Sequence, residues 1–176
     1  GGNLIDTADI YAPSWDTMGH NEALVGKALR AWTGDRDQVV VATKGGITRS
    51  AEVPWGRNAT PEYLRSALDA SRRALGVDVV DLYQWHRPDR RLLFSDVIET
   101  FASLRDEGSI RAIGLSNVNV EEIELAAGNS YKLTLNDAND TSTLLRDGIL
   151  LAAEQGLTVN AAADTASPLF LLGGAG

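Results

Sequence analysis

The sequence has no cysteine among its 176 residues and only two histidines. The absence of cysteine excludes a disulfide framework, a thiolate nucleophile and a cysteine-ligated metal site. Two histidines leave few ligands for a metal-dependent lyase or isomerase, a class that the sequence does not favour. We therefore expect no bound metal, and a chain without cysteine is compatible with a cytoplasmic protein.

Basic residues are also scarce, because 16 lysines and arginines stand against 24 acidic residues, for a formal net charge of -8. A nucleic-acid-binding protein needs a basic face to neutralise phosphates, so nucleic acid is not an expected partner. No uncharged stretch approaches the roughly 18 apolar residues that a membrane span requires, and no signal-peptide pattern opens the chain. We expect neither nucleic acid nor membrane as a partner.

Apolar segments are nevertheless frequent, since 44% of the residues are hydrophobic. Short apolar runs alternate with polar loops and amphipathic stretches along almost the whole chain, a pattern typical of α/β proteins. Their aliphatic composition with little polar alternation indicates parallel strands that are buried on both faces. The predicted strands cover residues 3–7, 38–44, 79–86, 111–116, 131–136 and 157–161.

Helices are predicted between these strands from the spacing of apolar residues. One of them has clear ends, with Thr60 as its N-cap, Pro61 as its first residue and Gly76 at its C-terminus. The other helices are expected over residues 22–32, 97–104, 120–127 and 144–152.

About six β/α units fit either a doubly wound sheet or a (β/α)8 barrel. The sequence has no Gly-x-Gly-x-x-Gly motif after a strand and no Gly-Lys-Ser/Thr phosphate loop. The absence of both nucleotide-binding motifs favours an incomplete TIM-type (β/α)8 barrel.

Polar side chains gather at the carboxyl ends of the predicted strands, the edge at which parallel α/β folds bind ligands. They are Asp6, Lys44, His86, Ser116, Asn117 and Asn136. Taken singly, Lys44 could be a strand-end charge that reaches water, and Asp6 could cap a loop. An acid, a lysine, a histidine and the nearby Tyr11 together exceed what loop capping requires, and they indicate an active site.

These four residue types form a set that can activate a phenol as a proton donor. A tyrosine hydroxyl has an ordinary pKa of about 10, which is too high for ready proton donation near neutrality. A lysine ammonium close to a phenol lowers its pKa, and an aspartate fixes the position of the lysine. A histidine can then hydrogen-bond a substrate carbonyl while a cofactor delivers a hydride to the carbon.

Four segments resemble the aldo-keto reductase family, namely residues 3–11, 41–44, 81–89 and 113–117. The resemblance implies a (β/α)8 barrel and an NADPH-dependent oxidoreductase that reduces a small aldehyde or ketone to an alcohol. It implies that Tyr11 is the general acid and that Lys44 and Asp6 tune it. His86 is then the residue that orients the substrate carbonyl.

The same resemblance implies a set of cofactor-binding residues. Ser116 and Asn117 correspond to the pair that holds the nicotinamide carboxamide. Where the family usually has Gln-Asn-x-Tyr on a strand, only Asn136 of that motif is present. Ser167 and Leu169 stand in a stretch that looks like the loop around the cofactor pyrophosphate, where backbone N–H groups are natural anion ligands.

The resemblance is strong over residues 1–127 and weak over residues 128–176, and we treat the whole chain as one partial barrel domain. A complete barrel needs about 250 residues, and the first and last strands of the family have no counterpart here. We therefore expect a truncated member or a fragment, whose open barrel edges favour self-association. The alternative function is that of a catalytically impaired family member that serves as a binding or regulatory subunit.

Overall fold

The computed structural model describes residues 3–119, 122–123, 151–152 and 169–172. These residues contain a six-stranded sheet in which every neighbouring pair of strands is parallel, in the order β1-β2-β5-β6-β8-β7. The strands are β1 (Leu4–Asp6), β2 (Val40–Gly45), β5 (Val80–Trp85), β6 (Ile110–Leu115), β7 (Leu151–Ala152) and β8 (Leu169–Leu172).

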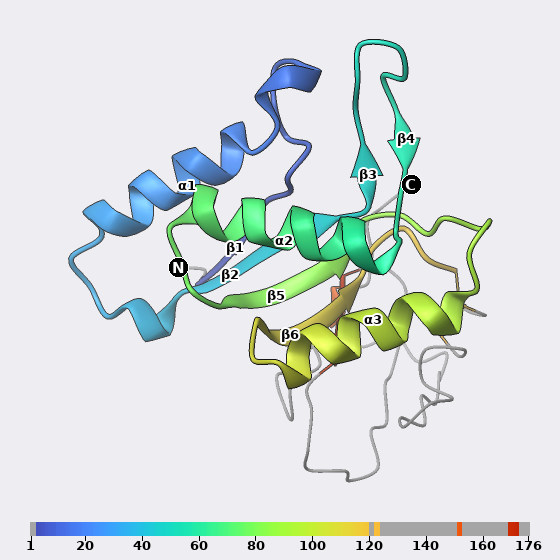
Figure 1. The fold of residues 1–176 in the computed structure, drawn as a ribbon. Coiled ribbons are helices and arrows are strands. Elements are labelled where there is room, and N and C mark those ends of the chain that lie inside the picture. Colours follow the sequence, from blue (N-terminus) through green and yellow to red (C-terminus); the bar gives the residue numbers. More distant parts are fainter. Residues whose placement is uncertain (1–2, 120–121, 124–150, 153–168, 173–176) are drawn as a thin grey trace, which may run out of the picture.

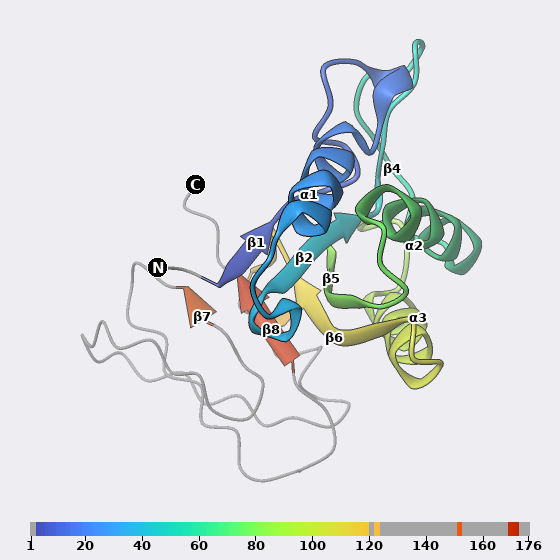
Figure 2. The same ribbon diagram turned by 90° about the vertical axis from the view of Figure 1, so that its left-hand side faces the viewer.

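Three α-helices cover one face of this sheet (Figure 1). They are α1 (His20–Ala31), α2 (Pro61–Leu75) and α3 (Phe94–Asp106). Figure 2 shows the strands along an arc with the helices on its outer side, which is the arrangement of a partial β/α barrel. Within the described residues β1 and β7 are the outer strands of the sheet and do not pair, so the barrel is not closed. Self-association through these edges stays a prediction.

Helix α2 begins and ends where the sequence predicts. The Thr60 hydroxyl accepts a hydrogen bond from the backbone N–H of Tyr63, and Pro61 occupies the first turn, where its missing N–H costs nothing. Gly76 adopts the left-handed conformation, with φ of 71°, and its N–H donates to the carbonyl of Arg72. Local capping chemistry therefore fixes both ends of α2.

Side chains alternate between two faces along each central strand. Outward residues such as Tyr83, Trp85 and Ile113 pack with the buried faces of α2 and α3 in the main hydrophobic core. Trp85 is buried against Phe94. The inward face carries a smaller apolar layer of Ala42, Leu82 and Ala112, packed against Leu4. This two-sided burial explains why the strands contain so few polar residues.

Two loops project beyond the carboxyl ends of the central strands (Figures 1 and 2). One contains the short 3-10 helix η1 (Trp15–Thr17), and the other is a hairpin of β3 (Ile47–Thr48) and β4 (Gly56–Arg57). A second 3-10 helix, η2 (Arg36–Gln38), precedes β2. The sequence patterns did not predict this hairpin.

The structure confirms the four predicted strands over residues 3–7, 38–44, 79–86 and 111–116. The predicted strands at 131–136 and 157–161 lie outside the described residues. The predicted helix over 144–152 is wrong at its end, because Leu151–Ala152 form β7. Leu169 begins β8 rather than lying in a loop. The error over residues 144–152 concerns a short apolar run, whose periodicity does not separate a helix from a buried strand.

No helix in the described ranges is both long and apolar enough to cross a membrane.

Gly26 provides a test of the close contact between α1 and α2. A Cβ atom at this position would lie 2.5 Å from the carbonyl oxygen of Leu75 and 2.6 Å from that of Ala74. Backbone atoms cannot move aside cheaply, so Gly26→Ala should lower the free energy of unfolding by about 1 to 3 kcal/mol. The steric clash should outweigh the roughly 1 kcal/mol of stability that alanine contributes over glycine through its higher helix propensity. Urea titration measures the difference, with the exposed Lys27→Ala as control, and an unchanged midpoint would contradict the packing.

Candidate active site

The four residues expected to form the active site lie together at the carboxyl end of the sheet. Asp6 is the last residue of β1, and Lys44 is the fifth of the six residues of β2. His86 follows β5, where its backbone N–H donates to the carbonyl of Gly45 at 2.9 Å. Tyr11 lies in the loop after β1. Parallel pairing of β1, β2 and β5 therefore brings side chains from distant parts of the chain to one edge.

Lys44 is the central charged group of this site. Its Nζ donates to Oδ2 of Asp6 at 2.6 Å and to the backbone carbonyl of Thr7 at 2.8 Å. Only 4% of Lys44 is exposed, so the side chain does not extend to water as a strand-end lysine would. A buried ammonium needs partners of this kind, because burial without them would cost several kcal/mol.

Tyr11 lies beside both Lys44 and His86. The Lys44 ammonium is 5.2 Å from the centroid of the Tyr11 ring. The rings of Tyr11 and His86 meet edge to face, with centroids 5.7 Å apart. Tyr11 is 43% exposed, so the ring is open to a molecule that approaches the mouth of the barrel.

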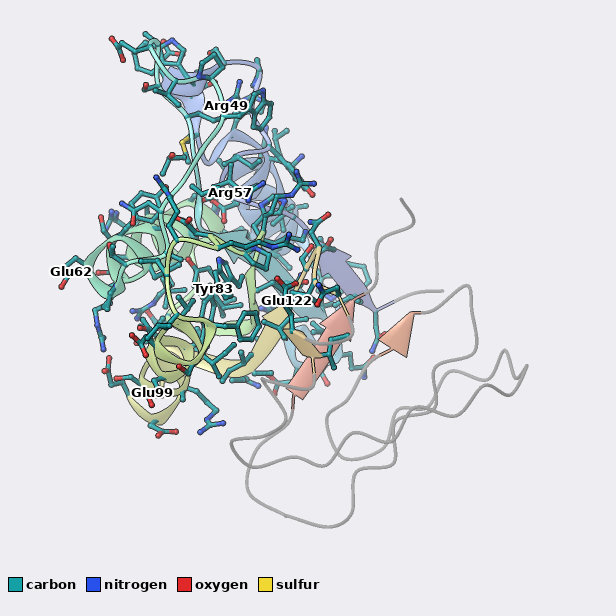
Figure 3. The ribbon with its side chains drawn as sticks, turned by 90° about the vertical axis from the view of Figure 1, so that its right-hand side faces the viewer. Arg49, Arg57, Glu62, Tyr83, Glu99 and Glu122 are labelled. Atoms are coloured by element: carbon teal, nitrogen blue, oxygen red, sulfur yellow. The ribbon has the colours of Figure 1, made fainter. Side chains whose placement is uncertain are left out.

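Arg49 holds the loop that carries Tyr11, a role that the sequence analysis missed. Its Nη1 donates to the carbonyl oxygens of Ile10 and Ala12, at 3.2 and 3.0 Å, on either side of Tyr11. Its guanidinium also lies 5.0 Å from the ring centroid of the exposed Trp55. Figure 3 shows Arg49 in the lobe that projects beyond the sheet. No sequence signal reveals this contact, because it joins two loops through main-chain atoms.

Gln84 is a second polar residue that the sequence analysis missed. It is fully buried, and its Nε2 donates to Oδ1 of Asp6 at 2.8 Å. Its inward position could have been predicted from the sequence, because Gln84 stands two residues before His86 and strand alternation places both on the same face. Gln84 therefore stands out as a polar residue on the face that also carries the apolar Leu82.

His86 is buried close to two cationic side chains. Burial, with further contributions from the charges of Lys44 and Arg87, lowers the pKa of His86 from 6.5 to about 4. The imidazole is therefore neutral near pH 7. Among the described residues its Nδ1 has no hydrogen-bond partner. A neutral imidazole keeps one N–H that can donate to a carbonyl oxygen.

Ser116 and Asn117 follow β6 at the same edge of the sheet. Nδ2 of Asn117 donates to the carbonyl of His86 at 2.9 Å and contacts the Ser116 hydroxyl at 3.0 Å. Asn117 has a φ of 58°, in the left-handed region that asparagine tolerates better than most residues. The amide oxygen of Asn117 lies at the exposed mouth, where it accepts a hydrogen bond from Nη2 of Arg87 at 3.4 Å. Such a hydroxyl and amide fit the carboxamide of a nicotinamide.

Three further residues were predicted to bind the cofactor, namely Asn136, Ser167 and Leu169. Asn136 and Ser167 are outside the described residues. Leu169 pairs with Ile113 in the middle of β6, so its backbone belongs to the sheet instead of a phosphate-binding loop.

Asp9 and Glu22 are two further buried carboxyl groups. Burial and the nearby charge of Glu22 raise the pKa of Asp9 well above its usual value. Burial raises the pKa of Glu22 as well, although its carboxylate accepts a hydrogen bond from the Thr43 hydroxyl at 2.5 Å. Tyr83, buried nearby between the sheet and the helices, is labelled in Figure 3.

Comparison with known proteins identifies the family of this chain. The model of the Aldo/keto reductase family matches residues 1–145. The chain belongs to the aldo/keto reductase family. The 6-dehydroglucose reductase of Novosphingobium aromaticivorans is 40% identical over 122 residues, which are 69% of this chain and 39% of that protein.

Solved structures of this family resemble the fold as well. The holo form of an aldo-keto reductase from Bacillus halodurans has a TM-score of 0.63 and 34% identity, over 74% of this chain and 41% of that one. An aldo/keto reductase from Klebsiella pneumoniae, in complex with NADP and acetate, has a TM-score of 0.52 and 29% identity, over 69% of this chain and 37% of that one. The chain thus spans about two fifths of the length of the curated relatives that it matches.

The lowered pKa of His86 predicts a pH-dependent contribution to stability. The unfolded chain binds a proton at His86 below about pH 6.5, whereas the folded chain does so only near pH 4. Stability from this group is therefore lost as the pH falls through that window, by up to about 3 kcal/mol. The difference in unfolding free energy between the wild type and His86→Gln should shrink or reverse from pH 7.5 to pH 4.5.

Urea titrations at four pH values in this range measure that difference. Both proteins keep Asp9 and Glu22, whose raised pKa values act in the opposite direction, so their effects cancel in the comparison. A difference that stays constant with pH would mean that His86 titrates normally in the folded chain.

Proposed function

We propose that this chain carries the catalytic centre of an oxidoreductase that reduces an aldehyde or ketone to an alcohol with NADPH. The observation that carries the proposal is the environment of Lys44. Its ammonium is buried, paired with Asp6 and directed at the ring of the exposed Tyr11. A loop-capping role for Asp6 and Lys44 would require neither the tyrosine nor the neutral histidine beside them.

In this proposal Tyr11 donates the proton. As a substrate carbonyl becomes an alcohol, its carbon gains a hydride and its oxygen gains the hydroxyl proton of Tyr11. The nicotinamide cofactor supplies the hydride when it is bound. Lys44 stabilises the negative charge that is left on the Tyr11 oxygen, and Asp6 keeps the ammonium in place.

His86 has a different role, because it is neutral and lies against Tyr11. Its N–H donates to the carbonyl oxygen and orients it toward the Tyr11 hydroxyl. A neutral donor suits this task, since a charged imidazolium would compete with Tyr11 as the acid. Ser116 and Asn117 would hold the carboxamide of the nicotinamide.

Substitution of the acid tests this function. Tyr11→Phe removes only the hydroxyl group and should lower the rate of aromatic aldehyde reduction by at least about a hundredfold. Cofactor affinity should change little, because the ring remains. The oxidation of NADPH at 340 nm reports turnover. Tyr63→Phe, which removes a hydroxyl bonded to the Ile47 carbonyl away from the cluster, is the matched control and should keep its activity.

Cofactor binding separates the enzyme from the alternative of a binding or regulatory subunit. Tryptophan fluorescence of the wild-type chain should be quenched by NADPH. Quenching without turnover would favour the regulatory subunit, and the absence of binding up to millimolar NADPH would contradict the enzyme. Turnover retained in Tyr11→Phe would contradict the assignment of the acid.

A further inference from the structure

Gln84 lies in the inner layer of the sheet, level with the active-site lysine. Strand pairing places it directly between Lys44 on β2 and Gly114 on β6. Its side chain is fully buried, although glutamine is rarely buried without a specific partner. The partner is Asp6 on β1, which receives the Gln84 amide at 2.8 Å.

The two oxygens of Asp6 are thereby held by two different donors. Oδ1 accepts from Nε2 of Gln84, and Oδ2 accepts from Nζ of Lys44 at 2.6 Å. The Asp6 side chain is 40% exposed, so packing alone does not hold its carboxylate. The amide of Gln84 has one favourable orientation here, because the flipped orientation would set its oxygen against a carboxylate oxygen.

Gly114 provides the space for the Gln84 side chain. A Cβ atom at Gly114 would lie 2.6 Å from Cγ of Gln84 and 3.1 Å from Cδ1 of Leu82. The backbone of Gly114 is not in the left-handed region, so the requirement for glycine is one of space. Gly114 on β6 thus leaves the space that the side chain of Gln84 on β5 occupies.

We propose that Gln84 is a positioning residue of the active site. It acts through Asp6, whose second oxygen fixes the Lys44 ammonium against Tyr11. This inference rests on the proposed function, in which Lys44 must be held in place while Tyr11 gives up its proton. Gln84 itself contacts neither substrate nor cofactor.

Gln84→Met tests this role, because methionine has a similar length and no donor. Loss of a hydrogen bond to a charged group should lower kcat by about tenfold to a hundredfold. KM for the aldehyde and the Kd of NADPH should stay within about threefold of the wild-type values, because no binding contact is removed. Leu82→Met, two residues earlier on the same face, is the matched control and should retain kcat. An unchanged kcat in Gln84→Met, or an equal loss in Leu82→Met, would overturn the proposal.

Gln84→Glu provides a second variant that keeps the length of the side chain. The introduced carboxyl group can donate to Asp6 only while it is protonated, and burial beside another carboxylate favours the protonated form. The ratio of its kcat to the wild-type kcat should therefore rise as the pH falls from 8 to 5.5. A merely structural role predicts a ratio that is constant with pH, which would overturn the proposal.

The ammonium resonance of Lys44 in a hydrogen–nitrogen correlation spectrum gives a readout that does not depend on turnover. We expect the signal in the wild type and in Leu82→Met, and its loss through faster exchange in Gln84→Met. If the wild-type chain has no turnover but the signal behaves in this way, the proposed function fails and the positioning of Lys44 stands. If the signal survives in Gln84→Met while Tyr11→Phe abolishes turnover, Gln84 does not position Lys44, and the proposed oxidoreductase function stands.

Discussion

The burial of the Lys44 ammonium is the constraint on which the rest of the site depends. A lysine with almost no exposure is tolerated only where its N–H groups find acceptors, and here they are the Asp6 carboxylate and the Thr7 carbonyl. Both acceptors come from the end of β1 and the residue after it, which lie beside β2 because the strands are parallel. The pairing of β1 with β2 therefore allows the ion pair between Lys44 and Asp6 to form at the edge of the sheet.

Other features follow from this buried charge. The charge of Lys44 adds to burial in keeping His86 neutral, so a buried cation and a neutral donor lie close together in the site. The open ring of Tyr11 lies beside both Lys44 and His86. Arg49 then fixes the backbone on both sides of Tyr11 through two carbonyl groups. The strands set the positions of Asp6 and Lys44, whereas a contact between two loops sets that of Tyr11.

Sequence reasoning predicted that Asp6, Tyr11, Lys44 and His86 lie at one edge of the sheet, because each stands at or near the end of a recognisable strand, and the structure brings them together there. It also placed α2, whose capping residues act locally. It missed Arg49 and Gln84 for different reasons. Arg49 acts across 39 and 37 residues on main-chain oxygens, which leave no trace in the sequence. The inward position of Gln84 could be predicted from strand alternation, but its contact with Asp6 depends on the order of the strands in the sheet. Leu169 was placed wrongly because an apolar run after a proline fits both a loop and a strand.

The most direct test of the central claim is the single-turnover rate of aldehyde reduction by preformed complexes of the chain with NADPH, for the wild type and Lys44→Met. Circular dichroism confirms that the variant is folded. If the buried ammonium enables Tyr11 to act as the acid, NADPH oxidation should proceed in the wild type and be nearly abolished in Lys44→Met, with NADPH still bound. Equal rates in the two proteins would contradict the account.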